Sequence, residues 1–262
     1  MDKKVYFMWI KMFKSEKILG ISLLILVFIL SFGAVSAANN TPDSNTLLTE
    51  TNNASNTVNT VNVEDVSNST GSFSDLQGLI DKDTSGNISL DRNYTYNSGS
   101  DDDYGQGVII NKNLTINGNG YTINGDNQAC LINIYDSTVN LNGLNFINGN
   151  STVFSVGGGV YAQNSTVIIG NCNFSNNTCP VYGGAISSVN STITITDSGF
   201  NDNQAKYGGA INTINSNLIL INNKFITNTA SYSGGAILNY NSTSILENNT
   251  FTANTALAVG NI

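Results

Sequence analysis

The chain has 262 residues, only 11% of them charged, and a formal net charge of −8 at pH 7. Without the first 17 residues, which hold five basic and two acidic side chains, five basic and sixteen acidic ones remain, a net charge of −11. That balance gives no electrostatic reason to bind nucleic acid or an anionic membrane, and the absence of histidine removes the commonest proton shuttle and metal ligand.

Residues 1–37 are predicted to be a secretory signal peptide with a helical apolar segment. Its lysine-rich start precedes an apolar run from Ile18 to Phe32, and Val35-Ser36-Ala37 supplies the small residues expected at a cleavage site. The alternative is a permanent membrane anchor, which needs about 20 apolar residues, whereas this run has 15. We expect membrane contact only through this leader, if it stays uncleaved.

Residues 38–71 are rich in Asn, Thr, Ser and Val and show no apolar periodicity. A segment of this composition cannot bury enough apolar surface to fold. We therefore expect a disordered tether that holds the folded part away from the surface near the N-terminus.

Residues 72–107 are predicted to form an N-terminal cap, a short helix followed by a first strand. Apolar residues follow helical spacing at Phe73, Leu76, Leu79 and Ile80. Ser74 and Gln77 fit a capping box, and residues 87–96 alternate as a strand does. Asp101-Asp102-Asp103 is predicted to be a solvated loop. The helix is expected to cover the apolar end that a solenoid exposes.

From residue 108 to 262 one pattern recurs about every 25 residues. In most copies a glycine pair precedes an aliphatic residue, an Asn-Ser or Asp-Ser pair follows four residues later, and an aromatic residue follows fourteen residues later. The aliphatic positions of five copies are Ile132, Val160, Ile186, Ile211 and Ile237. Their aromatic positions are Phe146, Phe174, Phe200, Phe225 and Phe251. Ile262 begins a further copy, and Tyr121 takes the aromatic position of an earlier one.

A repeat of constant length with one variable segment is typical of a solenoid. Within each copy apolar residues lie two apart, as do Val167 and Ile169, which indicates short strands. Parallel stacking at about 4.8 Å would place equivalent residues of successive turns over one another, in an aliphatic column and in an aromatic column from Tyr121 to Phe251. Asparagines at the corners would form amide ladders.

The sequence therefore predicts an all-β fold, a right-handed single-stranded parallel β-helix of about six rungs, where a rung is one turn of the solenoid. A β-propeller blade needs about 40 residues and a leucine-rich horseshoe needs a leucine-dominated consensus, so neither fits. A β-sandwich would not keep the same spacing through five copies.

Two features of the sequence resemble known families. Gly-Gly-Ala-Ile followed by Phe-x-x-Asn, as in Phe200 to Asn203, resembles the repeat of the chlamydial polymorphic outer-membrane proteins. The leader, the Asn/Thr-rich spacer, the segment from Phe73 to Gln77 and the segment from Leu114 to Gly120 are together similar to adhesin-like surface proteins of methanogenic archaea. The resemblance covers residues 72–262 and implies a right-handed β-helix displayed outside the cell. Because the chain stops within a repeat and shows neither a C-terminal membrane barrel nor a wall-binding module, we expect a fragment or a short paralogue.

Asp81, Asp83 and Ser85 occupy the first, third and fifth positions of a segment that resembles the start of an EF-hand loop. Arg92 stands at the twelfth position, where such a loop needs a bidentate acid. We therefore favour a polar turn, with weak calcium binding as the alternative, and we expect no cofactor.

Parallel β-helices of the pectin-lyase-like fold also serve as polysaccharide lyases and hydrolases, so an enzyme is an alternative function. Such chemistry needs two converging carboxylates, or carboxylates that hold calcium beside a basic residue. In the predicted register Asp197, Asp202 and Glu247 have no carboxylate at the equivalent position of an adjacent rung. We therefore predict no catalytic residues.

The cysteines are odd in number and cannot form a complete disulfide framework. Cys130, Cys172 and Cys179 are predicted to be reduced apolar fillers, with a Cys172–Cys179 bridge across a turn as the alternative.

Sequons for N-glycosylation, Asn-x-Ser/Thr, recur at several sites that include Asn113, Asn150, Asn164, Asn190 and Asn241. An Asn-rich repeat generates such triplets by chance, and its corners need asparagine in any case. Glycosylation of a secreted chain is the alternative interpretation.

Insertions in solenoids gather on one face, often the face used for recognition. Here the variable segment lies between each aromatic residue and the next glycine pair, and its longest copy runs from Ile147 to Ser155. Tyr182, Tyr207 and Tyr232 fall on this edge and are candidate binding residues that stack on sugars or pack on a protein. We favour the other interpretation, in which they pack beneath the loop as a small satellite core.

Together these observations predict a secreted or surface-displayed, adhesin-like β-helix without catalytic activity. Its expected partners are a host or neighbouring-cell surface, recognised through a glycan or a protein, and no nucleic acid. The alternatives are a structural component of the cell envelope without a specific ligand and, less favoured, a polysaccharide lyase or hydrolase.

Overall fold

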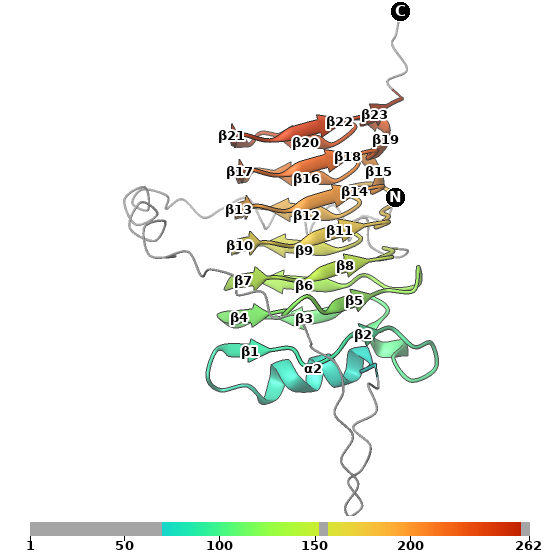
Figure 1. Cartoon of the computed structure of the whole chain (residues 1–262), viewed down its shortest axis with the longest axis vertical. Coiled ribbons are helices and arrows are strands. Elements are labelled where there is room, and N and C mark those ends of the chain that lie inside the picture. The colour runs from blue at the N-terminus through green and yellow to red at the C-terminus, as the bar shows by residue number, and fades with distance from the viewer. Residues whose placement is uncertain (1–69, 152–156, 258–262) are drawn as a thin grey trace, which may run out of the picture. The chain divides into compact units, whose positions relative to one another are not determined.

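The computed structural model describes residues 70–151 and 157–257 (Figure 1). The predicted signal peptide, almost all of the predicted tether and Ile262 lie outside the described residues. The backbone of Gly71 already pairs with its neighbours, because its N–H donates to the carbonyl of Asn93 and its carbonyl accepts the N–H of Thr95, both at 2.8 Å. The fold therefore begins just before the predicted boundary of the tether.

Most of the described chain forms short strands, arranged in three long sheets and one short one. The first sheet contains β1 (Asn87–Ser89), β4 (Leu114–Asn117), β7 (Thr138–Asn142), β10 (Thr166–Gly170), β13 (Thr192–Thr196), β17 (Asn217–Ile221) and β21 (Thr243–Glu247). The second contains β2 (Tyr94–Thr95), β5 (Thr122–Asn124), β8 (Asn145–Ile147), β11 (Asn173–Ser175), β14 (Gly199–Asn201), β18 (Lys224–Ile226) and β22 (Thr250–Thr252). The third contains β3 (Val108–Ile110), β6 (Ile132–Tyr135), β9 (Val160–Gln163), β12 (Ile186–Val189), β16 (Ile211–Ile214) and β20 (Ile237–Tyr240). The short sheet contains β15 (Gln204–Tyr207), β19 (Thr229–Ser233) and β23 (Thr255–Ala256).

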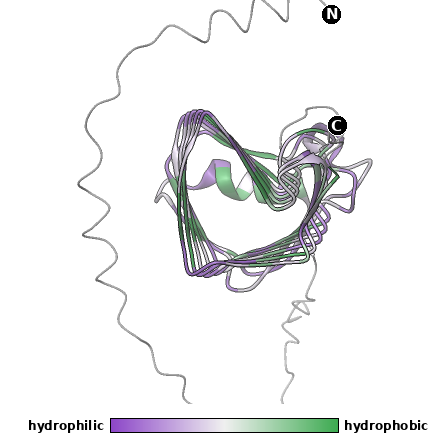
Figure 2. Ribbon diagram, turned by 90° about the horizontal axis from the view of Figure 1, so that it is seen from above, coloured by the Kyte–Doolittle hydropathy of each residue, from purple (hydrophilic) through white to green (hydrophobic). Residues whose placement is uncertain are grey.

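Successive strands of the chain fall in different sheets, and neighbouring strands within each sheet are parallel. The backbone therefore winds around a common axis, and the rungs superpose in a three-sided outline when they are seen from above (Figure 2). This arrangement confirms the predicted parallel β-helix, a solenoid of about six turns. The cap contributes β1 and β2, which begin the first and second sheets.

The predicted aliphatic column follows the third sheet. Its members pair in register at Val108, Ile132, Val160, Ile186, Ile211 and Ile237. All of them are fully buried except Ile237, which lies on the last described rung. In the first sheet the apolar residues two apart, Val167 and Ile169 among them, are buried from Leu114 and Ile116 to Leu218 and Leu220.

The aromatic column follows the second sheet, with one correction. Phe146, Phe174, Phe200, Phe225 and Phe251 stack with ring centroids 4.6 to 4.9 Å apart. The predicted position of Tyr121 in this column is wrong, because Ile123 pairs with Phe146, and Tyr94 pairs with Ile123. The corner before β5 is two residues longer than the corner before β8. The aromatic residue Tyr121 therefore does not mark the column position of this rung.

Asparagines form ladders at the corners, as predicted. The backbone N–H groups of Asn177, Asn203 and Asn228 each donate to the Oδ1 atom of the equivalent asparagine one rung later, at 3.1, 3.1 and 2.9 Å. Their side-chain N–H groups donate to the carbonyl of the phenylalanine one rung earlier, as Asn203 does to Phe174 at 3.0 Å. All three side chains are fully buried, so the Phe-x-x-Asn spacing serves to satisfy buried backbone groups.

The cap helix α2 (Phe73–Lys82) lies beneath the first rungs (Figure 1). Phe73, Leu76 and Ile80 are buried against them, whereas Leu79 is 36% exposed and lies off the buried face. None of the helices within the described ranges is long and apolar enough to cross a membrane.

The predicted capping box at Ser74 and Gln77 is wrong, because the helix begins two residues earlier than that pair requires. Ser72 is the N-cap residue, and its hydroxyl accepts the N–H of Asp75 at 3.1 Å. The Asp75 carboxylate accepts the N–H of Ser72 at 2.9 Å in return. This reciprocal pair satisfies two N–H groups that have no partner within the helix.

Gln77 instead pairs with the edge of the third sheet. Its Nε2 atom donates to the carbonyl of Ile109 at 3.0 Å, and its Oε1 atom accepts the N–H of Ile109 at 2.7 Å. Ile109 lies in β3, the first strand of that sheet. The side-chain amide therefore replaces the peptide of a neighbouring strand and occupies an edge that would otherwise be unpaired.

Asp101 does not belong to a solvated loop, contrary to the prediction, because it is fully buried. Its carboxylate accepts the backbone N–H groups of Phe73, Ser74 and Asn97, each at 3.0 Å. It thus lies on the first turn of α2, where free N–H groups and the helix dipole stabilise negative charge. Its neighbours Asp102 and Asp103 are exposed and belong to η2 (Asp102–Tyr104).

The three cysteines are buried and free, as predicted, so the alternative Cys172–Cys179 bridge is not formed. Burial raises the pKa of each thiol, that of Cys172 to about 11. A buried thiol with a raised pKa carries little thiolate at neutral pH and reacts slowly.

Candidate functional site

The loop with the calcium-like spacing is held by hydrogen bonds of its own. Asp83 accepts the hydroxyl of Ser85 at 2.6 Å and the N–H of Gly86 at 2.8 Å, and the Lys112 ammonium lies 4.0 Å from its Oδ2 atom. The hydroxyl bond, above all, lowers the pKa of Asp83 below its ordinary value. Asp81 accepts a hydrogen bond from Gln77 at 2.9 Å. The geometry is therefore that of a polar turn, and no group of three His, Cys, Asp or Glu side chains suited to a metal occurs in the described ranges.

The acidic residues of the repeat lie in polar ladders. Asp197 accepts a hydrogen bond from Asn222 of the next rung at 3.1 Å, and Asp202 accepts one from Thr227. Glu247 lies beside Ile221 in the register of β17 and β21. The described neighbours of these three carboxylates on the paired rung are thus an amide, a hydroxyl and an aliphatic side chain.

The structure brings the three predicted tyrosines together at the corner of the short sheet, which we call the tyrosine corner. Tyr182 and Tyr207 bridge in parallel, and Tyr232 follows in β19. The rings of Tyr182 and Tyr207 stack with centroids 5.7 Å apart, and Tyr232 meets Tyr207 edge-on at 5.2 Å. Tyr232 is 49% exposed, whereas the other two are half-buried. The satellite-core interpretation therefore holds only in part, because the cluster packs on itself and still reaches solvent.

A cation completes the tyrosine corner. The Lys206 ammonium lies 5.3 Å from the ring centroid of Tyr207 and 5.8 Å from that of Tyr232, distances at which a cation is attracted to an aromatic face. No described carboxylate lies within ion-pair distance of it. The place of Lys206 beside the rings depends on the register of β15 and β19, which the repeat pattern alone does not give.

The outward face of the first sheet is a second exposed surface. From β7 to β17 its outward positions carry only Thr, Asn, Ile and Gly, so this face has no charged side chain on an acidic protein. Thr192, Thr194 and Thr196 occupy one strand, and Ile168 is 44% exposed on a neighbouring one. Such a flat, uncharged and partly apolar face suits contact with an uncharged surface.

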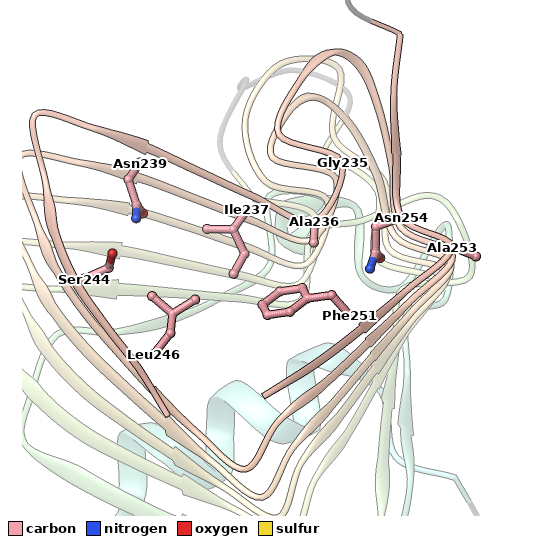
Figure 3. A pocket seen from close by; sticks show the side chains of 9 residues that line it. All are labelled: Gly235, Ala236, Ile237, Asn239, Ser244, Leu246, Phe251, Ala253 and Asn254. Atoms are coloured by element: carbon pink, nitrogen blue, oxygen red, sulfur yellow. The ribbon is translucent and has the colours of Figure 1, made fainter. Parts of the chain in front are cut away.

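A hollow of about 540 Å³ opens on the last described rung (Figure 3). Its walls consist of apolar and amide side chains and the hydroxyl of Ser244, and Ile237, Leu246 and Phe251 point into it. Phe251 is 46% exposed, whereas Phe225 directly beneath it is fully buried. The hollow is thus the interior of the solenoid seen end-on, and its described lining offers mainly apolar contact, with no carboxylate or basic side chain.

Comparison with known proteins gives no assignment of family or function. The chain matches no protein-family model, and it matches no curated protein.

Proposed function

We propose that this chain is a secreted or surface-displayed, adhesin-like protein that contacts a cell surface through a glycan or a protein ligand and has no catalytic activity. The β-solenoid is consistent with either an adhesin-like or a structural role. The predicted leader and tether, together with the low content of charged residues, support display outside the cell.

The tyrosine corner is the observation that carries this proposal. Tyrosine offers a large, rigid contact surface at low entropic cost, with an apolar ring and a polar hydroxyl. Here three rings and one ammonium gather at one corner of a rigid scaffold, with Tyr232 reaching solvent. A sugar ring or a protein side chain can therefore pack on the ring of Tyr232. The same ligand can form hydrogen bonds with the tyrosine hydroxyls and with Lys206.

The placement of the acidic residues supports a role without catalysis. Each carboxylate of the late rungs is either bonded to an amide or hydroxyl of the next rung, as are Asp197 and Asp202, or lies beside an aliphatic residue, as does Glu247. These residues do not provide the converging pair that a lyase or hydrolase of this fold would need.

Binding of residues 38–262 to a glycan array and to fixed cells tests the proposal. Tyr232→Ser and Tyr207→Ser should each weaken binding at least about tenfold, because an aromatic anchor contributes more than about 1.4 kcal/mol. Tyr240→Ser is the matched control, since Tyr240 is 68% exposed on the third sheet, away from the corner. Loss of binding in this control alone would contradict the assigned site.

The same experiment separates the alternatives. An absence of reproducible binding would favour a structural envelope component without a specific ligand. Turnover of pectin or a related uronide that Asp197→Asn or Asp202→Asn abolishes would instead establish an enzyme and overturn the proposal.

A further inference from the structure

Five successive corners between the third and the first sheet share one geometry. Each begins with an Asp or Asn whose φ lies between 47° and 52°, followed by a serine: Asp136, Asn164, Asn190, Asn215 and Asn241. In this left-handed region Asn and Asp are the non-glycine residues best tolerated. Three of these corners, at Asn164, Asn190 and Asn241, also read as complete Asn-Ser-Thr sequons.

The corner serines after Ser137 are hydrogen-bonded within the fold. The Ser191 hydroxyl donates to the carbonyl of Val189 at 2.8 Å and accepts the backbone N–H of Ser165, one rung earlier, at 3.1 Å. Ser216 and Ser242 repeat the same pair of bonds. These serines therefore form a continuous ladder along the axis, and their presence needs no functional explanation.

The threonine that completes the sequon is not required by the fold. At Asn215 the third position is Asn217, which begins β17 in the same register as Thr192 begins β13. In the first of the five corners Asp136 replaces the asparagine. The ladder still continues there, because Asn164 donates to the Asp136 carboxylate at 3.0 Å. The fold thus accepts corners without a sequon. The corners at Asp136 and Asn215 are two such cases and serve as internal references for the three corners with a sequon.

The three sequons are also presented to solvent. Asn164, Asn190 and Asn241 are exposed at the apex of their corners, and Thr166 and Thr243 are exposed two residues later. Sequons elsewhere in the chain include Asn87 and Asn173, whose backbones lie within strands. The corner column therefore combines a complete triplet with an accessible amide on a convex edge.

We propose that this corner column is a site of N-linked glycosylation, with glycans on Asn241 and on Asn164 or Asn190. This inference rests on the proposed export of the chain. In the reaction, the Nδ2 atom forms a bond to C1 of an oligosaccharide carried by a polyprenyl phosphate or diphosphate. The bond from C1 to the phosphate oxygen breaks, the lipid phosphate leaves, and Nδ2 gives up one proton.

The amide ladder tolerates this modification. Asn164 donates from Nδ2 to Asp136 in one direction and accepts from Asn190 at Oδ1 in the other, so the N–H that it uses points away from its carbonyl. A glycosylated asparagine is a secondary amide, and the trans form that such amides prefer keeps the remaining N–H in that orientation. The sugar takes the place of the other hydrogen, so the ladder bond to Asp136 is retained.

Spacing along the axis limits the number of glycans. Asn164 and Asn190 lie on adjacent rungs, about 4.8 Å apart, which is too close for two sugar chains to leave side by side. Asn190 and Asn241 are separated by the rung of Asn215, which doubles that distance. We therefore expect one glycan shared between Asn164 and Asn190 and a second on Asn241.

Peptide mapping by mass spectrometry of the full chain, expressed in a cell that glycosylates exported proteins, tests the inference. Thr166→Val, Thr192→Val and Thr243→Val remove each sequon while keeping the corner asparagine and the side-chain shape, and each should remove the mass increment of its own peptide. Asn217→Thr completes the sequon at Asn215, which lies one rung from both Asn190 and Asn241, and should therefore move an increment to the Asn215 peptide from one of these neighbours. The matched control Asn215→Gln alters a corner without a sequon and should change no increment.

The outcomes separate this inference from the proposed function. An exported chain whose three corner peptides carry no increment overturns the glycosylation inference and leaves the proposed function standing. A chain that is retained inside the cell overturns the proposed function, and the inference falls with it.

Discussion

At the N-terminal end of the described solenoid the apolar interior lies beneath α2, whereas at the last described rung the equivalent interior faces outward (Figures 1 and 3). Phe73 and Leu76 are fully buried against the first rungs, while Phe251 is 46% and Leu246 is 49% exposed. The two ends are built from residues of the same kind. Among the described residues, what differs is that α2 covers the first end, whereas Phe251 and Leu246 are partly exposed at the other.

The comparison shows that the repeat and the cap depend on different interactions. Within the repeat, each rung is stabilised by an equivalent rung on either side, through stacked rings and amide ladders. At the cap, the interactions are specific to single residues: Gln77 pairs with the edge of β3, and Asp101 accepts three N–H groups at the start of α2.

Truncation of an interior phenylalanine should cost far more than truncation of the exposed one. Phe200 is fully buried between two stacked rings, so Phe200→Ala should lower the free energy of unfolding by about 3–5 kcal/mol. Phe251→Ala should cost less than half of that, because its ring is already partly in water. Urea unfolding of both variants measures the difference, and equal losses would contradict the contrast between interior and end.

Removal of the charge at the start of α2 should give the next largest effect. Asp101→Asn keeps the shape of the side chain but places an amide NH₂ group against backbone N–H donors, which should cost about 2–3 kcal/mol of unfolding free energy. The neighbouring Asp103 is exposed, so Asp103→Asn is the control and should change the stability by less than about 0.5 kcal/mol. Equal effects of the two substitutions would show that the buried carboxylate does not stabilise the cap.

Loss of the side-chain pairing at β3 should have a smaller and more local effect. Gln77→Ala removes two hydrogen bonds at the sheet edge and should cost about 1–2 kcal/mol. Hydrogen exchange of the Ile109 amide should accelerate about tenfold, since 1.4 kcal/mol corresponds to a factor of ten. The control Lys82→Ala alters an exposed residue of the same helix, and acceleration of Ile109 exchange in this variant too would rule out a specific role for Gln77.

The smallest effect concerns pH. The hydrogen bond from the Ser72 backbone, chiefly, lowers the pKa of Asp75. A carboxyl group whose pKa is lower in the folded state contributes stability that is complete above its unfolded pKa of about 3.9 and is lost as the pH falls through the folded value. Asp75→Asn should therefore lower the melting temperature at pH 7, by the equivalent of about 0.5 kcal/mol for an exposed group, and leave it unchanged near pH 2. An equal shift at both pH values would contradict this origin.

The repeat could be predicted from the sequence because its constraints are local and recur. The constant step from Ile186 to Phe200 in every later copy fixed both columns and the strand alternation between them. Tyr121 was misplaced because an aromatic residue was used as a marker of register at a corner two residues longer than the later ones. The strands pair according to their backbone register. The type of residue at a position indicates that register only where the corners have the same length.

The cap was predicted less well because its interactions join distant residues and occur once. Asp101 looked solvated beside two further acids, and its partners Phe73 and Ser74 lie 28 and 27 residues away. Ser74 and Gln77 have the spacing of a capping box, whereas the helix uses Ser72 with Asp75. At the tyrosine corner the repeat predicted the alignment of the rings, whereas the position of Lys206 between them required the structure.

Every feature of this fold depends on in-register stacking of the rungs, and distances between spin labels on the outward face of the first sheet measure that stacking. Thr115, Thr194 and Ile245 occupy one row of that face, and the native cysteines are buried, so the labels would attach to the introduced residues. Labels at Thr115→Cys with Thr194→Cys should lie about 14 Å apart, three rungs, and labels at Thr115→Cys with Ile245→Cys about 24 Å apart, five rungs. Distances that do not grow with the number of intervening rungs would contradict the solenoid, and with it the cap, the tyrosine corner and the proposed glycosylation of the corner column.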